Sequence, residues 1–170
     1  MDAFTIRPAT PAEAEALCAL HKASVRSLCL GAYTADEIEA WLRDREPASY
    51  RQAMTAGGET MLVAERDGAV AGFASIKETM LFGLYVDPVR GRGSGRILLQ
   101  AVEEEVRRRG AAVLSLQATL NAVPFYRKHG YMRQDRSTVR RGGRDLAVLD
   151  MTKSLTPSSR PEREARSGET

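Results

Sequence analysis

The chain is poor in features that mark several classes of protein. Aromatic residues make up only 6% of its 170 residues, and no recognised nucleic-acid-binding motif accompanies them, so no nucleic-acid partner is expected. No apolar run approaches the ~18 residues that a membrane-spanning helix needs, so no membrane partner is expected either. The first residues lack the basic and apolar regions of a secretory signal. These absences predict a cytoplasmic protein.

Cysteine is scarce as well, with only Cys18 and Cys29 in the sequence. Both fall in one stretch with a helical pattern, where their spacing corresponds to ~16 Å along the axis, too far for a disulfide. Reduced thiols agree with a cytoplasmic location. No cluster of His, Cys and Asp has metal-ligand spacing, so no metal is predicted.

What is present suits one globular domain, since 43% of the residues are hydrophobic. We expect this domain to cover residues 1–152. The last segment, 153–170, is rich in Ser, Pro, Arg and Glu with almost nothing to bury, which predicts a disordered tail.

The most informative stretch is a predicted strand, 80–86, followed by a glycine-rich turn and a helix that ends near Gly110. Such a turn presents unpaired backbone N–H groups, and the helix N-terminus adds partial positive charge. Arginines stand among the glycines, which predicts a pyrophosphate cradle; the alternative is an ordinary glycine-rich turn, and the rest of the chain has to decide between them. The segment reads Arg90, Gly91, Arg92, Gly93, Ser94, Gly95, Arg96.

Neither of two common phosphate-binding motifs fits this turn. A Walker loop needs a lysine after its last glycine, and the dinucleotide fingerprint needs G-x-G-x-x-G, in which Arg96 would have to be a glycine. The turn instead resembles the R-x-x-G-x-G signature of the GNAT superfamily of N-acetyltransferases. A second segment, 121–131, resembles that family's N-x-x-x-x-F/Y-Y-x-x-x-G-F/Y pattern, and the likeness extends over residues 4–151. The N-terminal part, with His21, Tyr33 and Trp41, resembles a bacterial subgroup of general acetyltransferases.

This resemblance implies an α+β (α/β three-layer) fold, with a mixed, mostly antiparallel twisted sheet and helices on both faces. It implies acetyl-CoA as co-substrate, with the pyrophosphate on the 90–96 loop and a contact from Asn121. Leu84, Tyr85 and Val86 would pair with the pantetheine amides, and a free N–H near Val86 would stabilise the thioester oxygen if the strand splays from its neighbour. The sequence departs from the family where Val89 alone separates Pro88 from Arg90, so the loop is one residue short.

Acetyl transfer also needs a proton for the departing thiolate. Tyr126 is the candidate general acid, because a phenol with a pKa near ~10 stays protonated at neutral pH; the alternative is a core aromatic beside Phe125. The base that takes the amine proton stays open among several residues, for which a cap, a solvated face or core packing are competing explanations: His21, Asp36, Glu37, Glu39, Glu78.

Charge is uneven along the chain. Residues 1–89 contain 8 basic and 13 acidic residues, and residues 90–170 contain 17 and 9. We therefore expect the acceptor near the N-terminal helices, with His21, Tyr33, Trp41 and Glu78 near it, and hypothesise that acidic residues favour a cationic amine. Trp41 shares a helical face with Ile38 and Leu42, so core packing is the competing reading.

The predicted function is direct transfer of acetyl from acetyl-CoA to a primary amine of a small molecule. Two alternatives stay open: a non-catalytic acyl-CoA-binding or sensing module, and a peptide or protein N-terminal acetyltransferase. A homodimer is left open.

Overall fold

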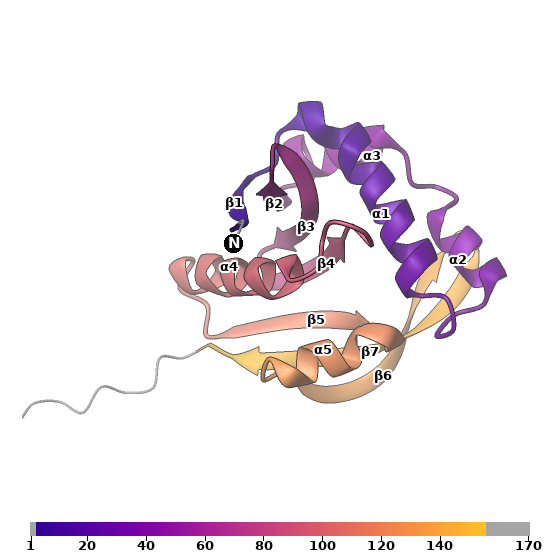
Figure 1. Ribbon diagram of the computed structural model, residues 1–170. Helices are drawn as coiled ribbons and strands as arrows, with labels where there is room; N and C mark the ends of the chain where they lie inside the picture. Colours follow the sequence, from indigo (N-terminus) through magenta and orange to yellow (C-terminus); the bar gives the residue numbers. More distant parts are fainter. Residues whose placement is uncertain (1–2, 156–170) are drawn as a thin grey trace, which may run out of the picture.

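The computed structural model describes residues 3–155. One curved sheet runs through the molecule, with helices on both of its faces (Figure 1). The strands are β1 (Thr5–Pro8), β2 (Thr60–Arg66), β3 (Ala69–Lys77), β4 (Met80–Val86), β5 (Val113–Thr119), β6 (Met132–Arg141) and β7 (Arg144–Ser154). The helices are α1 (Ala14–Leu28), α2 (Ala35–Leu42), α3 (Pro47–Thr55), α4 (Ser94–Arg108) and α5 (Val123–Lys128), with 3-10 turns at Pro11–Glu13 and Leu120–Ala122.

The sheet has seven strands in the order β1-β2-β3-β4-β5-β7-β6. All neighbours are antiparallel except β4 and β5, which are parallel. The predicted α+β fold with a mixed, mostly antiparallel sheet is confirmed. The parallel pair lies at the middle of the order, between two antiparallel halves.

Apolar stripes decide which helix covers which face. The α4 stripe, Leu98, Leu99, Val102 and Val106, packs with Tyr126 of α5 into the core on one face. On the other face α1 and α3 pack over β2 and β3. The C-terminal end of α1 and the whole of α2 form a third cluster with Leu146 of β7.

Two local features of the structure use residues that are typical of their geometry. Asp67 and Gly68 both have positive φ, 52° and 75°, as the turn of a two-residue hairpin requires. Thr34 and Glu37 form a reciprocal cap, with the Glu37 N–H donating to Thr34 Oγ1 at 3.1 Å and the Thr34 N–H donating to Glu37 Oε1 at 3.0 Å. At Thr10 the cap opens a short 3-10 turn, and α1 follows it.

The predicted boundary of the tail is wrong by three residues. β7 continues through Lys153 and Ser154, and Leu155 is fully buried. Lys153 is held because its Nζ donates to the buried carboxylate of Glu103 at 2.9 Å. The expected disorder from residue 156 onward lies outside the described residues.

Candidate active site

The sheet opens at its parallel pair. Pairing between β4 and β5 is limited to Met80 with Ser115 and Leu81 with Leu116. Beyond these residues the two strands part, so one edge of β4 is left without a partner strand among the described residues. The splay that a free N–H near Val86 requires is therefore present, and it creates an opening within the sheet.

Alternation along β4 decides which peptide groups face this opening. The Asp87 N–H donates to Ala71 O of the β3 side at 2.8 Å. Because antiparallel ladders alternate, the peptide groups of Tyr85 also face β3, and those of Leu84 and Val86 face the opening. Of the three predicted residues, Leu84 and Val86 can offer backbone groups, whereas Tyr85 contributes its side chain.

A β-bulge reshapes β4 just before this edge. Ser75 pairs with Gly83 and Ile76 with Leu81, which leaves Phe82 as the extra residue. A Cβ at Gly83 would lie 2.5 Å from the Tyr85 ring, so glycine lets that ring lie across the strand. Gly83 therefore accompanies both a bulge in the strand and the close approach of the Tyr85 ring.

The glycine turn follows β4, and fewer of its residues are available to bind a pyrophosphate than the sequence predicted. The Gly91 N–H donates to Asp87 O at 2.8 Å, and the Ser94 N–H and hydroxyl both donate to Gly91 O. Ser94 is buried and does not line the cavity described below, so its contact with the cofactor stays a prediction. Arg90 is also outside the cavity: Asp87 accepts its backbone N–H at 2.9 Å and contacts its guanidinium at 3.4 Å.

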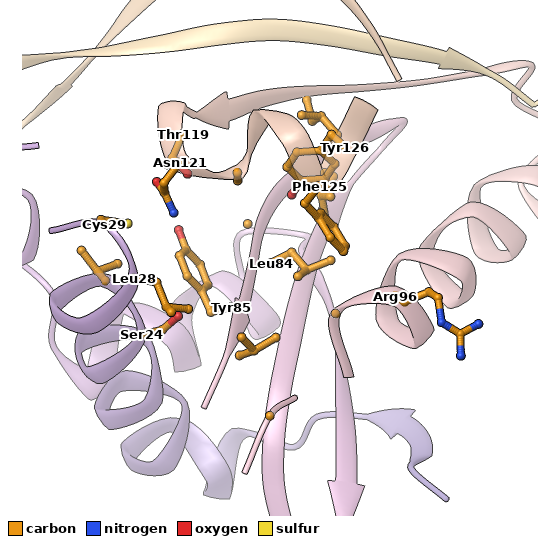
Figure 2. Close-up of a pocket in the computed structure, with 18 of the residues that line it drawn as sticks. Ser24, Leu28, Cys29, Leu84, Tyr85, Arg96, Thr119, Asn121, Phe125 and Tyr126 are labelled. Atoms are coloured by element: carbon orange, nitrogen blue, oxygen red, sulfur yellow. The ribbon is translucent and has the colours of Figure 1, made fainter. Parts of the chain in front are cut away.

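The N-terminus of α4 supplies the remaining donors. Gly93 has a φ of +89°, a left-handed conformation that favours glycine, and it precedes the first helical residue. The N–H groups of a first helical turn have no intrahelical partner. Gly93, Gly95 and Arg96 all line the opening, with Arg92 beside them. The Arg96 side chain points away from the other labelled residues in Figure 2, at the edge of the site.

These elements enclose a cavity of about 630 Å³, which we call the splay cavity. It runs from the α4 N-terminus along β4 to α5 and the end of α1. Tyr126 and Asn121 line it as predicted, and the Tyr126 hydroxyl forms no hydrogen bond with any described residue. Burial raises the pKa of Tyr126, which keeps the phenol protonated.

Cys29 lies in the same cavity, beside Asn121 (Figure 2). Burial raises the pKa of its thiol to about 11, against a smaller opposing effect of a hydrogen bond with Asn121. Cys29 is therefore a thiol and not a thiolate at neutral pH. Both cysteines are free, as expected.

A second cavity of about 490 Å³ adjoins the first, and we call it the α3 cavity. The two share a wall made of Leu81, Phe82, Gly83, Tyr85 and Gln117. Its charged lining residues among those described are Arg45, which precedes α3, Glu59, which precedes β2, and Arg141, at the end of β6. The hypothesis of an acidic pocket is wrong for this cavity, because two of its three charges are positive.

His21 is the most unusual residue of the α3 cavity. Its ring is 1% exposed and stacks on Tyr85 with centroids 3.7 Å apart. Its Nδ1 hydrogen-bonds with the Tyr50 hydroxyl at 2.6 Å, and its buried Nε2 has no partner among the described residues. Burial lowers the pKa of His21 well below its usual value, and the charges of Arg45 and Arg141 lower it further. His21 is therefore neutral at pH 7.

Of the other residues predicted to lie near the acceptor substrate, one lines a cavity and two do not. Trp41 is buried and lines the splay cavity. The Tyr33 hydroxyl donates to Ala147 O at 2.5 Å and accepts from the Leu120 N–H at 3.1 Å, so Tyr33 is a packing residue that lines neither cavity. Glu78 lines neither cavity either; it is exposed in the β3–β4 turn with a φ of 54°. Both were expected near the acceptor; neither lines one of these two cavities, and their roles toward an acceptor stay predictions.

Sequence reasoning missed three charged residues of the α3 cavity: Arg45, Glu59 and Arg141. They come from three segments far apart in the chain, and no motif connects them. A weak signal existed at Gly142 and Gly143, because a glycine pair after Arg141 predicts a tight hairpin whose flanking residues lie close to other elements.

A sheet opened at a parallel pair, with helix N–H groups at one end and a free phenol inside, is suited to an extended ligand with an anionic end. The chain belongs to the GNAT acetyltransferase family: residues 29–155 match the family described as acetyltransferase (GNAT) domain. It is thus an N-acetyltransferase by family.

Solved structures agree with this assignment. The chain is 35% identical to a GCN5-related N-acetyltransferase from Rhodopseudomonas palustris, over 91% of this chain and 97% of that one, with a TM-score of 0.84. It is 28% identical to a ribosomal-protein-alanine N-acetyltransferase from Brucella melitensis, over 88% and 99%, with a TM-score of 0.68. It also shares its fold with the paia N-acetyltransferase from Thermoplasma acidophilum, which is in complex with coenzyme A, at 21% identity over 89% and 99% and a TM-score of 0.72.

Proposed function

We propose that the protein transfers acetyl from acetyl-CoA directly to a primary amine of a small molecule. The observation that carries this proposal is the splay cavity, which brings three kinds of donor to one opening. These are the N–H groups of Gly95 and Arg96 in the first turn of α4 for a pyrophosphate, the peptide groups of Leu84 and Val86 for an extended chain of amides, and the free hydroxyl of Tyr126. In the relative from Thermoplasma, coenzyme A is bound to the same fold.

The chemistry follows from which groups lie where. The amine nitrogen forms a bond to the acetyl carbon while the carbon–sulfur bond breaks, and the electron pair leaves with sulfur. Tyr126 donates its phenolic proton to that sulfur and regains one from solvent. The Val86 N–H supplies a donor for the thioester oxygen as negative charge develops there. The nitrogen loses its proton through water toward Glu59, the carboxylate that lines the α3 cavity.

No metal takes part in this proposal. Among the described residues no group of three His, Cys, Asp or Glu side chains could hold a metal ion, and the steps above need none. No described helix is long and apolar enough to cross a bilayer. A cytoplasmic location and a homodimer stay predictions.

The test is release of free CoA thiol from acetyl-CoA with a panel of small amines and short peptides. We expect saturable turnover with a small amine and, in Tyr126→Phe, a kcat lower by about 10² or more. Affinity for acetyl-CoA should change little, because the substitution removes one hydroxyl from a preserved ring. Phe125→Leu is the matched control, since it changes a neighbouring ring of the same cavity that carries no hydroxyl.

Three outcomes would contradict parts of the proposal. Saturable CoA binding without turnover on any amine would make the protein a binding module. Turnover on peptides alone would make it a peptide N-terminal acetyltransferase. A near-normal kcat in Tyr126→Phe would show that Tyr126 is a core-packing residue and not the general acid.

A further inference from the structure

The α3 cavity carries an unusual arrangement of charge. Arg45 and Arg141 both line it, and neither forms an ion pair within 4.0 Å with an Asp or Glu of the described residues. Arg141 is partly buried, and its pKa is lowered by burial and by the nearby Arg45. The cavity contains one carboxylate, that of Glu59, against these two cations, so it keeps a net positive charge that destabilises the fold. An anion bound between them would remove that cost.

The chain holds Arg141 in this place by specific contacts. The hairpin tip after Arg141 packs so closely on α2 that a Cβ at Gly142 would overlap the backbone of Ala40. The Arg43 side chain also donates to Gly142 O at 3.4 Å. The hairpin is thereby fixed against the loop that carries Arg45. Planar guanidinium groups are well suited to carboxylates and other oxyanions, which they bind with paired hydrogen bonds.

The same cavity offers acceptors of hydrogen bonds on its sheet side. Glu59 accepts a hydrogen bond from the Ser75 hydroxyl, and Ser75 pairs with Gly83 in the wall that the two cavities share. His21 adds a buried Nε2 without a partner among the described residues. A carboxylate is suited to an amine or ammonium group and not to an anion, and His21 Nε2 accepts from an amine in the tautomer whose Nδ1–H donates to the Tyr50 hydroxyl. The cavity thus combines a site for an anion with a site for an amine.

We propose that the acceptor is a small amine that also carries an oxyanion, with the oxyanion bound by Arg45 and Arg141 and the amine facing Glu59 and His21. This proposal rests on the proposed function and adds the chemical class of its acceptor. A carboxylate and a phosphonate share the required chemistry. The amine end lies toward the shared wall, next to the opening in which acetyl-CoA would bind.

The experiment uses three matched acceptors and the full chain: an α-amino acid, its carboxamide, and the aminophosphonate of the same side chain. We expect kcat/KM for one of the anionic acceptors to exceed that of the carboxamide by at least tenfold, mainly through a lower KM. Arg45→Gln and Arg141→Gln should each remove most of this preference, because kcat/KM falls far more for the anionic acceptor than for the carboxamide. Whichever anion is preferred identifies the source of the charge.

Arg140→Gln is the matched control. Arg140 neighbours Arg141, pairs with Asp145 at 3.0 Å and does not line the cavity, so its loss should leave the preference intact. Calorimetric titration of each acceptor into the CoA-loaded protein gives a readout without turnover, in which only the anionic acceptors should bind measurably. Arg141→Lys, which keeps the charge but loses the planar fork, should retain part of the preference.

Equal kcat/KM for the anionic acceptor and the carboxamide would overturn the acceptor class while leaving the acetyltransferase standing. A preference unchanged in both arginine variants would do the same. If the protein neither bound CoA nor showed turnover with any acceptor, the proposed function itself would be contradicted. If turnover is absent but CoA binds, titration decides: no binding of either anionic acceptor overturns the inference.

Discussion

At the scale of single residues, His21 best illustrates how burial controls chemistry. Four aromatic rings surround it: Trp41, Tyr50, Phe73 and Tyr85. One ring nitrogen is used by the Tyr50 hydroxyl, and the other is buried without a partner among the described residues. Such a histidine is a poor base, because its charged form would lose hydration and face two arginines. It is better suited to accept or donate one hydrogen bond in its neutral form.

This environment predicts how stability depends on pH. In the unfolded chain His21 has a pKa of about 6.5, whereas in the folded chain burial, Arg45 and Arg141 lower it. Above pH 6.5 both states are neutral at this site and stability is unaffected. Below pH 6.5 His21 is protonated in the unfolded chain but stays neutral in the folded chain. The free energy of unfolding should therefore fall by up to about 1.4 kcal/mol for each pH unit of acidification.

Urea denaturation between pH 7.5 and 5 tests this expectation. His21→Asn keeps a polar group near the position of Nδ1 and removes the titration. The slope of unfolding free energy against pH should therefore be flatter in His21→Asn than in the natural chain. Parallel slopes in the two proteins would show that His21 titrates normally when folded.

At the scale of secondary structure, the site is organised by the turn between β4 and α4. Gly91 is required because a Cβ there would lie 2.5 Å from Asp87 O and 2.6 Å from Ala71 O. Gly93 is required by its positive φ. Gly95 differs from both: its φ is ordinary, and a Cβ would meet Phe125, Val86 and Leu84 at normal contact distances of 3.6–3.7 Å. The fold does not need a glycine there, and the residues that a side chain would approach line the splay cavity.

Gly95→Ala therefore separates folding from binding. Alanine in a helix is more favourable than glycine, by up to about 1 kcal/mol in a helix interior, so the variant should unfold at the same or a higher temperature. The added methyl group occupies the end of the splay cavity beside β4, and we expect the Kd for CoA to rise at least tenfold. Calorimetry with CoA and thermal unfolding measure the two effects.

Gln100→Ala on the exposed side of α4 is the control, because it raises helix propensity without entering either cavity. Unchanged affinity for CoA in Gly95→Ala would remove the α4 N-terminus from the proposed pyrophosphate site.

These elements also show which parts of the site the sequence could predict. The strand, the glycine turn and Tyr126 were predictable, because each depends on residues close together in the chain and on backbone preferences of glycine and proline. Arg90 was assigned to the cradle by its place in the motif, but in the shortened loop Asp87 holds it outside. Arg45, Glu59 and Arg141 were not predictable, because they come from three distant segments that only tertiary packing brings to one cavity.

At the scale of the whole molecule, the two cavities lie on either side of one strand. The splay cavity adjoins α4 and α5, and the α3 cavity adjoins α1 and α3. They meet at the bulged part of β4, where Phe82, Gly83 and Tyr85 line both. Two ligands can therefore enter from separate sides and be bound at the same time, one in each cavity, with their ends meeting within the sheet.

This arrangement predicts a sequential kinetic mechanism, in which acetyl-CoA and the amine are bound together before acetyl moves. Initial velocities measured over a grid of both substrates should give intersecting double-reciprocal lines.

The rival mechanism is ping-pong, with acetyl carried first by a protein nucleophile, and Cys29 is the thiol in the splay cavity that could carry it. Its pKa of about 11 leaves little thiolate at neutral pH, so it is a weak nucleophile there. Cys29→Ala should consequently keep kcat within about threefold, and mass spectrometry after mixing with acetyl-CoA alone should detect no acetylated protein. Parallel lines, together with an acetyl adduct that Cys29→Ala abolishes, would replace direct transfer by a covalent intermediate and would leave the meeting of the two cavities without its proposed role.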